Sequence, residues 1–257
     1  MLYCSQTMKI ENLVTSVFSA QGKRPKMEDA FFLSLNFGGG LYAGVYDGHG
    51  GDYAAYFAKR YLHTAFLKHS QSKDALRSFD EAYNETSRFI KRIDNSGTTA
   101  ADVFIYNNIV YCANAGDTRI IAISGTNTKE LSLEHRLKNE TERHRVSSYE
   151  GVETSNQHLF YKDYQIMVTR ALGDIYFENA GVISDPHCNC DDTILADYSK
   201  WKWLFIATDG VFDVMDDNEI AELFLRIKDP HNAAEFICKK ALKKSTDNVT
   251  AIAIKLQ

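Results

Sequence analysis

The sequence has few cysteines, few prolines and no long apolar run. Five scattered cysteines in 257 residues are too few for a disulfide framework and favour a reducing compartment. Three prolines, and no stretch rich in Pro, Gly or Ser, leave no linker to divide the chain, so one domain is expected. No apolar run could cross a bilayer, and the first residues lack the apolar core of a signal peptide. We therefore expect a cytoplasmic or nuclear protein with no membrane contact.

Excess positive charge is also absent. The formal net charge is -5 and the pI is near 5.9, whereas nucleic-acid binding usually leaves a basic footprint. We expect no nucleic-acid partner and a monomeric protein. If such an acidic chain acts on an anionic substrate, it needs local positive charge, which an arginine or a bound metal ion can supply.

One acidic residue follows an apolar strand pattern and precedes a glycine-rich turn. The run 41–46 is typical of a strand, and it stops at Asp47. His49 and three glycines follow, before a helical pattern begins at Asp52. Asp and Gly are also usual residues of an ordinary turn, so this stretch alone does not indicate a site.

The same arrangement recurs along the chain. Carboxylates stand at the ends of further predicted strands, namely Glu28, Asp29, Asp117, Asp209 and Asp247. If these ends converge, two carboxylates about 4 Å apart repel by about 4 kcal/mol at an effective dielectric constant near 20. Such groups must protonate or bind cations. Oxygen ligands suit hard ions, which makes Mg²⁺ or Mn²⁺ the natural occupant.

The order of the predicted elements indicates an α+β fold. Strand patterns at 14–20 and 28–35 are predicted to pair, and helices are expected at about 52–68, 73–93, 218–227 and 231–244. Strands come in consecutive runs and helices in consecutive pairs, which argues against a doubly wound parallel sheet. Two packed antiparallel sheets with helix pairs outside fit this order best.

Residues 124–165 have a weak pattern. They are polar and irregular, with a charged stretch at 134–145 that could be helical. The histidines at 135 and 144 are nine residues apart, which is not the spacing of a metal pair, so both are predicted to lie on the surface. We expect this segment to be mobile or to face a substrate.

Seven short motifs together resemble the metal-dependent protein phosphatases of type 2C, the PPM family. The match spans about residues 16–256. In chain order the motifs are Gly22-x-Arg24-x-x-x-Glu28-Asp29, Tyr46-Asp47-Gly48-His49-Gly50-Gly51, Ser96-Gly97-Thr98-Thr99-Ala100, Asn114-Ala115-Gly116-Asp117-Thr118-Arg119, Thr169-Arg170-Ala171-Leu172-Gly173-Asp174, Ala207-Thr208-Asp209-Gly210 and Asp247-Asn248-Val249-Thr250.

The resemblance implies a four-layer α-β-β-α sandwich of two antiparallel β-sheets flanked by pairs of antiparallel helices. It implies a single catalytic domain over 13–257 after a leader at 1–12. The implied enzyme is a protein serine/threonine phosphatase, whose partners are phosphorylated proteins. The implied reaction uses a metal-activated water without a phospho-enzyme intermediate, so the cysteines are not candidate nucleophiles.

The resemblance also implies roles for particular residues. Asp47 bridges two Mg²⁺ or Mn²⁺ ions, and the backbone carbonyl of Gly48 ligates one of them. Asp209 and Asp247 ligate the other ion, and Glu28 and Asp29 act largely through water. Asp117, together with Asp209, corresponds to a weaker third metal site. Arg24 corresponds to the arginine that holds the phosphate, and His49 to the general acid.

Two departures from the family pattern stand out. Glu134-His135 replaces an Asp-His pair, and the flap region 146–165 carries less glycine. These changes leave the metal set intact but leave substrate preference open.

Two other functions remain to be weighed. A phosphatase-like interaction module without turnover would be expected to lose metal carboxylates or the arginine, and this chain keeps them. A nuclease or small-molecule phosphoesterase could use similar carboxylates, but the acidic pI argues against a nucleic-acid substrate.

Overall fold

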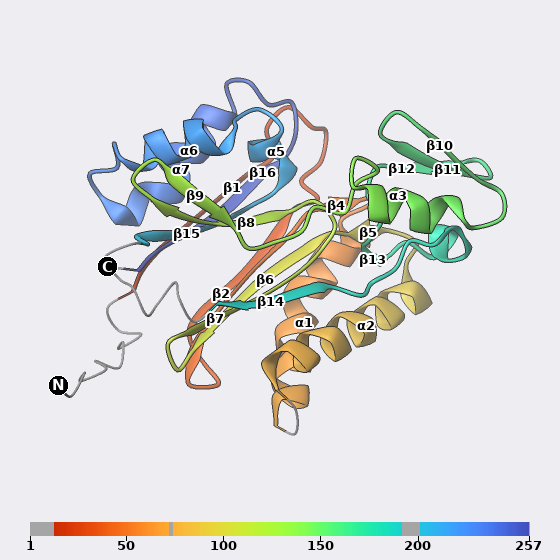
Figure 1. Ribbon diagram of the computed structural model, residues 1–257, viewed down its shortest axis with the longest axis horizontal. Helices are drawn as coiled ribbons and strands as arrows, with labels where there is room; N and C mark the ends of the chain where they lie inside the picture. The colour runs from red at the N-terminus through yellow and green to blue at the C-terminus, as the bar shows by residue number, and fades with distance from the viewer. Residues whose placement is uncertain (1–12, 72–73, 192–200, 257) are drawn as a thin grey trace.

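The computed structural model describes residues 13–71, 74–191 and 201–256, so the leader expected at 1–12 lies outside the described residues. The described chain has a mixed α+β fold in which all strands of each sheet pair antiparallel. Helices α1 and α2 lie on one side of the strands, and α6 and α7 lie on the other (Figure 1).

One five-stranded sheet is called here the β16 sheet. It has the strand order β1 (Val14–Ala20), β16 (Val249–Lys255), β15 (Trp203–Ala207), β8 (Arg119–Ser124) and β9 (Asn127–Glu130). The first and last strands of the described chain are neighbours in this sheet. Its assembly therefore joins segments more than two hundred positions apart, such as Ser19 and Thr250, whose hydroxyls hydrogen-bond at 2.8 Å.

The other five-stranded sheet is called the β3 sheet. Its order is β14 (His187–Asp191), β7 (Ile109–Ala115), β6 (Ala100–Tyr106), β3 (Gly40–Tyr46) and β2 (Ala30–Phe37). Every residue of β3 is buried. A strand that is apolar at consecutive positions, as the run 41–46 is, needs cover on both of its faces.

Three apolar clusters cover the faces of the two large sheets, and the first two of them cover β3. One cluster contains side chains of both sheets, including Val45, Val103 and Ile252, so the sheets pack against each other. A second joins the β3 sheet to α1 (Tyr53–Ser70) and α2 (Ala75–Ile93). A third joins the β16 sheet to α5 (Asp209–Phe212), α6 (Asp217–Phe224) and α7 (Ala233–Ala241). Each fully buried large apolar side chain contributes roughly 1.5–3 kcal/mol.

Side-chain caps mark several helix starts. The carboxylate of Asp74 accepts from the backbone N–H of Arg77 at the start of α2. Asp216 and Glu219 form a reciprocal capping box at the start of α6. The 3₁₀ turn η3 (Pro230–Asn232) precedes α7 and is capped by Asp229. Capping of this kind satisfies backbone donors that the helix itself leaves unpaired.

Two small sheets accompany the large ones, although only two sheets were expected. β13 (Leu172–Gly173), β5 (Gly97–Thr98) and β4 (Gly48–His49) form one of them. β10 (Val152–Ser155), β11 (His158–Tyr161) and β12 (Tyr164–Ile166) form the other, beside α3 (Glu140–Ser147). Residues 124–165, which the sequence leaves largely unpatterned, thus contain defined elements. Val146, Leu159 and Ile166 give this part a buried cluster of its own.

One predicted strand pairing is wrong. Strands β1 and β2 were expected to be partners, but β1 pairs with β16 and β2 pairs with β3. The reason is that the basic loop between them crosses from one sheet to the other instead of turning back as a hairpin. That crossing is what carries Arg24 between the sheets.

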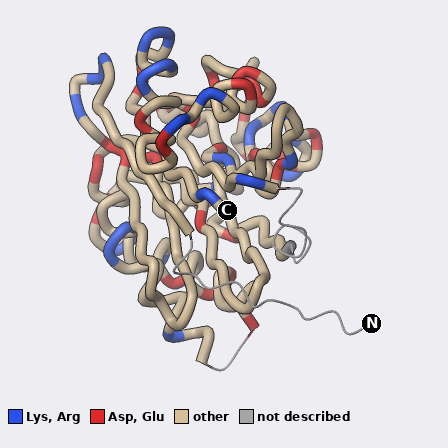
Figure 2. The backbone as a smooth tube through the Cα atoms, turned by 90° about the vertical axis from the view of Figure 1, so that its left-hand side faces the viewer, with Lys and Arg blue, Asp and Glu red and all other residues tan. Residues whose placement is uncertain are grey.

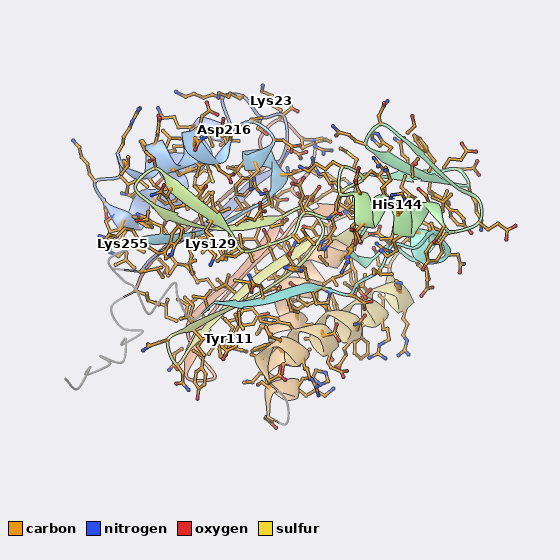
Figure 3. All side chains as sticks on the ribbon, viewed as in Figure 1. Lys23, Tyr111, Lys129, His144, Asp216 and Lys255 are labelled. Carbon is orange, nitrogen blue, oxygen red and sulfur yellow. The ribbon has the colours of Figure 1, made fainter. Side chains whose placement is uncertain are left out.

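Two further expectations concern the surface of the molecule. Among the described residues, no helix combines the length and the apolarity that crossing a bilayer requires. Basic and acidic positions alternate over the face seen in Figure 2, and no basic stripe runs across that view. His144 lies exposed on α3, as predicted (Figure 3).

Candidate metal centre

The antiparallel register of the β16 sheet gathers four of the predicted site positions at one edge. Ala207 at the end of β15 is opposite Ala251 near the start of β16, and Arg119 at the start of β8 is opposite Ala207. The residues just beyond these strand ends therefore share one edge. They are Asp209, Asp247 and Asp117, with the 21–29 loop that carries Arg24 after β1.

The β3 sheet brings two more carboxylates to the same place. Ala30 at the start of β2 is opposite Tyr46 at the end of β3, so Asp29 and Asp47 are neighbours. The backbone at Asp47 is held by Thr99, whose N–H donates to the Asp47 carbonyl at 2.9 Å. The Thr98 hydroxyl donates to the same carbonyl at 3.0 Å. The carboxylate thus projects from a fixed backbone.

Mutual repulsion marks this group of carboxylates. Burial, and then the charges of Asp29, Asp209, Asp117 and Asp247, raise the pKa of Asp47 well above its ordinary value. Burial is also the main cause that raises the pKa of Asp29 to about 7 and that of Asp209 to about 8. Without a counter-ion the charged forms are disfavoured, which is the behaviour expected of ligands awaiting a cation.

One buried oxygen fits the same interpretation. Asp29 is almost fully buried, and its Oδ2 accepts from the Thr208 hydroxyl at 3.3 Å. Its Oδ1 is buried and has no hydrogen-bond partner among the described residues. Leaving a buried polar atom unsatisfied costs about 1–3 kcal/mol. A divalent ion or its bound water, supplied to an all-oxygen donor set, would remove that cost.

Two arginine side chains form ion pairs with carboxylates of this centre. Arg24 donates from Nε and Nη2 to the two carboxylate oxygens of Asp247, at 2.8 and 2.7 Å. Arg136 donates from Nη2 to Oδ2 of Asp209 at 2.8 Å. As they stand, no three His, Cys, Asp or Glu side chains in the described ranges converge closely enough to chelate an ion. A metal ion at Asp247 would compete with Arg24, which now contacts both oxygens of that carboxylate.

His49 lies on β4 beside a buried carboxylate. Its Nε2 is 2.8 Å from Oδ2 and 2.9 Å from Oδ1 of Asp174. Burial lowers the pKa of His49, but the Asp174 carboxylate outweighs it and raises that pKa above 6.5. Asp174 has a left-handed backbone (φ 57°), and its carboxylate fits only because Gly97 has no Cβ. The histidine is thus oriented by its neighbour, and the Asp174 carboxylate favours its protonated form through the raised pKa.

Two glycines of the motifs are required by close backbone approach. A Cβ on Gly48 would lie 2.4 Å from the carbonyl oxygen of Glu28, and one on Gly210 would lie 1.9 Å from that of Asn248. Each contact joins the segments on which two predicted ligands stand. Both glycines therefore allow the carboxylate-bearing segments to meet.

A cleft of about 680 Å³ opens over these residues. Its far wall comes from the β11–β12 sheet and η2 (Ile175–Ala180), where the exposed rings of Tyr164 and Tyr176 stack with centroids 4.4 Å apart. Eight of the nine predicted site residues line the cleft, namely Arg24, Glu28, Asp47, Gly48, His49, Asp117, Asp209 and Asp247. Asp29 is buried instead, against Thr208.

Three charged residues of the site were not assigned a role from the sequence. They are Asp174, Arg136 and Asp213. Asp174 was visible as the end of a motif, and Asp213 caps the C-terminus of α5, four residues after Asp209. Nothing in the sequence marks Arg136, because it stands in the weakly patterned segment.

The prediction for His135 is wrong. It was expected on the surface but is completely buried under the turn that leads to Asp117. Its backbone N–H donates to the Gly116 carbonyl at 3.0 Å, and its Nδ1 lies 3.2 Å from the Gly116 nitrogen and oxygen. Burial lowers the pKa of His135 to about 3, so the ring is neutral. It supports the Asp117 turn from beneath.

The fold and the cleft define an α+β protein with a buried carboxylate centre suited to divalent ions. Comparison with known families and proteins agrees with this class. The family model described as protein phosphatase 2C matches residues 14–250. The chain belongs to the protein phosphatase 2C family of protein serine/threonine phosphatases.

Similar proteins include yeast and protozoan relatives. Protein phosphatase 2C homolog 1 of Saccharomyces cerevisiae is 30% identical, over 90% of this chain and 88% of its own length. The solved structure of serine-threonine phosphatase 2C from Toxoplasma gondii is similar with a TM-score of 0.82, 19% identity and 94% coverage of both chains. A Caenorhabditis elegans sex determining protein is similar with a TM-score of 0.84 and 23% identity, covering 95% of this chain and 65% of that one.

Proposed function

We propose that the chain is a metal-dependent phosphatase that hydrolyses phosphoserine and phosphothreonine on proteins without a phospho-enzyme intermediate. The observation that carries the proposal is the meeting of Asp29, Asp47 and Asp209 at one place, where burial and the charges of neighbouring carboxylates raise the pKa of each. Mg²⁺ or Mn²⁺ is the expected cofactor, two ions per site. When bound, such a pair lowers the pKa of a shared water and aims it at phosphorus.

The residues that would hold the ions are those at the joint edge of the two sheets. Asp47 and the carbonyl of Gly48 stand on the side of the β3 sheet, and Asp209 and Asp247 on the side of the β16 sheet. Glu28 and Asp29 would act through water. The arrangement supports the four-layer α-β-β-α sandwich and the single catalytic domain over 13–257 that the family implies.

Arg24 and His49 supply the remaining chemistry. Once Arg24 leaves Asp247, its planar guanidinium can grip two phosphate oxygens, which a lysine cannot do in the same way. His49, whose protonated form is favoured by the Asp174 carboxylate, is suited to give a proton to the departing serine or threonine oxygen. Asp174 positions the imidazole and does not itself meet the substrate in this proposal.

The test is phosphate release from a phosphothreonine peptide with and without Mg²⁺ or Mn²⁺. We expect activity only with the ion, and its loss in Asp47→Ala and Asp209→Ala. Asp229→Asn, which changes an exposed capping carboxylate at η3, should keep wild-type activity. Metal-loaded protein that fails to hydrolyse any of several phosphopeptides would refute the proposal. Chromatography with light scattering tests the expected monomer, and fluorescent tagging the cytoplasmic or nuclear location.

A further inference from the structure

Arg136 is fixed in the carboxylate centre by its backbone neighbours. The Thr169 N–H donates to the carbonyl of His135 at 2.9 Å, and Arg136 forms an antiparallel bridge with Val168. On the other side, His135 is bonded to the Gly116 turn. Hydrogen bonds on both sides thus hold the backbone of Arg136 beside Asp117. The side chain therefore starts from a fixed point next to the carboxylates.

Three aspartates surround its guanidinium. Nε donates to Oδ2 of Asp117 at 2.5 Å. Nη2 donates to Oδ2 of Asp209 at 2.8 Å. Nη1 donates to Oδ1 of Asp213 at 3.1 Å. Glu134 adds a fourth carboxylate 3.6 Å from Nε.

The Arg136 guanidinium is nearly buried, whereas its three aspartate partners are exposed to different extents. The Arg136 side chain is 10% exposed, whereas Asp117 is 5%, Asp209 is 22% and Asp213 is 51% exposed. Removing one member of a buried ion pair leaves an uncompensated charge, which is strongly unfavourable. Carboxylate oxygens are also the donors that a hard divalent ion would take, and those of three aspartates surround this guanidinium. The guanidinium and such an ion therefore compete for one place.

We propose that Arg136 is a built-in cation that takes the place of a third metal ion, so that this chain binds two divalent ions and not three. The proposal rests on the two-metal centre of the proposed function and replaces the weaker third site that the resemblance implies at Asp117. It also makes Arg136 a positioning residue. The contact with Asp209 uses Oδ2, and the proposal assigns Oδ1 of Asp209 to the metal pair.

Calorimetric titration of the full chain with Mn²⁺ tests this directly. We expect two ions per chain for the wild type and three for Arg136→Met, which keeps the apolar stem but removes the charge. Arg136→Lys keeps the charge and should bind two. Arg119→Met is the matched control, because Arg119 is similarly buried between Glu130 and Asp217 away from the cleft, and it should also bind two.

Thermal unfolding gives a second readout that does not depend on activity. Without metal, Arg136→Met should melt at a lower temperature than the wild type, because three carboxylates lose their counter-charge. Mn²⁺ should raise its melting temperature by more than it raises that of the wild type. Equal rises in the two proteins would contradict the proposal.

The outcomes separate this proposal from the proposed function. Three ions in the wild type overturn the role of Arg136 while leaving a metal-dependent phosphatase, and this result needs no variant to fold. Two ions in Arg136→Met overturn it as well. No Mn²⁺ binding and no hydrolysis by the wild type would instead overturn the proposed function.

Discussion

Arg24 and Asp247 form the contact on which the state of the cleft depends. The pair is bidentate at 2.8 and 2.7 Å, with half of the arginine side chain exposed. The same carboxylate is an expected metal ligand, and the same guanidinium is the expected phosphate ligand. We therefore expect a metal ion at Asp247 to weaken the hold of Arg24 on this carboxylate, which would make the guanidinium more available to a substrate phosphate.

Arg24→Ala should consequently bind metal more tightly and turn over less. Exposed ion pairs contribute about 0.2–1 kcal/mol, so Mn²⁺ affinity should rise by no more than about five-fold. The value of kcat/KM for a phosphopeptide should fall, because the phosphate loses its fork-shaped donor. Calorimetry and steady-state kinetics measure the two effects. Weaker metal binding in this variant would show that Arg24 does not compete for Asp247.

Asp102 is a buried acid that the proposed reaction does not use. It is completely buried on β6, where Tyr46 donates to Oδ1 at 2.8 Å and Tyr83 donates to Oδ2 at 2.7 Å. Burial raises its pKa to about 7, and the tyrosine hydroxyls only partly offset that rise. The folded state therefore holds the Asp102 proton more tightly than the unfolded state does, whose pKa is about 3.9. Stability is lost as the pH rises from about 4 to about 7, and the loss levels off above the folded pKa.

Asp102→Asn should remove this loss. The amide cannot ionise, and Tyr83 can still donate to the Ala113 carbonyl, which is 2.9 Å away. The wild-type stability should therefore fall relative to the variant by up to about 1.4 kcal/mol per pH unit through this window. Denaturant unfolding of both proteins in chelator, from about pH 5 to about pH 8, measures the difference. Parallel stability curves would contradict the assignment.

The elements around the cleft divide into a rigid part and a recognition part. The ends of β3, β15 and β16 carry the carboxylates, and these strands are buried along almost their whole length. The opposite wall is built from β11, β12 and η2, and its aromatic side chains are exposed. The carboxylates are thus held by the ends of the sheet strands, and we expect the segment at 146–165 to face the part of a substrate beyond the phosphate.

Tyr164→Ala tests that division. Tyr164 is 41% exposed and stacks on Tyr176 with the rings 6° from parallel, so the pair offers a flat apolar surface to a peptide. The KM for a phosphopeptide should rise about three- to ten-fold, as expected for one lost aromatic contact, with kcat little changed. The KM for p-nitrophenyl phosphate should not change. Tyr56→Ala on α1, equally exposed but away from the cleft, is the control. Equal rises for both substrates would place Tyr164 in the phosphate site instead.

The whole molecule should be more stable when its carboxylates are neutralised. Asp29, Asp47 and Asp209 belong to segments from both sheets, so their repulsion acts against the packing that joins the sheets. Ions bound only by the folded state contribute about 2.7 kcal/mol at one hundred times their dissociation constant. For a chain of this size that corresponds to a rise in melting temperature of about 5–10 °C.

Calorimetry with Mn²⁺ and with chelator measures this rise. Asp47→Asn should melt at a higher temperature than the wild type in chelator, because one repelling charge is gone, and should gain less from Mn²⁺. Asp216→Ala, which breaks the capping box of α6, should lower both melting temperatures by a similar amount and leave the metal-induced rise unchanged. If Asp47→Asn keeps the full Mn²⁺-induced rise in melting temperature, Asp47 is not a metal ligand.

Local pattern was sufficient for most elements and for choosing candidate site residues, eight of which line one cleft. The predicted strand at 14–20 agrees with β1, and the expected helices at about 52–68 and 73–93 agree closely with α1 and α2. Periodicity indicates which face of an element is apolar. The sequence also gives the chemical type of each side chain directly. Asp47, Asp209 and Asp247 could therefore be singled out as metal ligands from strand ends and motifs.

Partners distant in the chain required the folded structure. The pairing of β1 with β16, the burial of His135 and the ion pairs of Arg136 all join residues through contacts that no local pattern encodes. The apolar pattern of β1 specifies that one face is covered, but equally apolar strands compete to cover it. Packing of the complete chain selects which strands pair. That pairing in turn determines which charged side chains meet in the cleft.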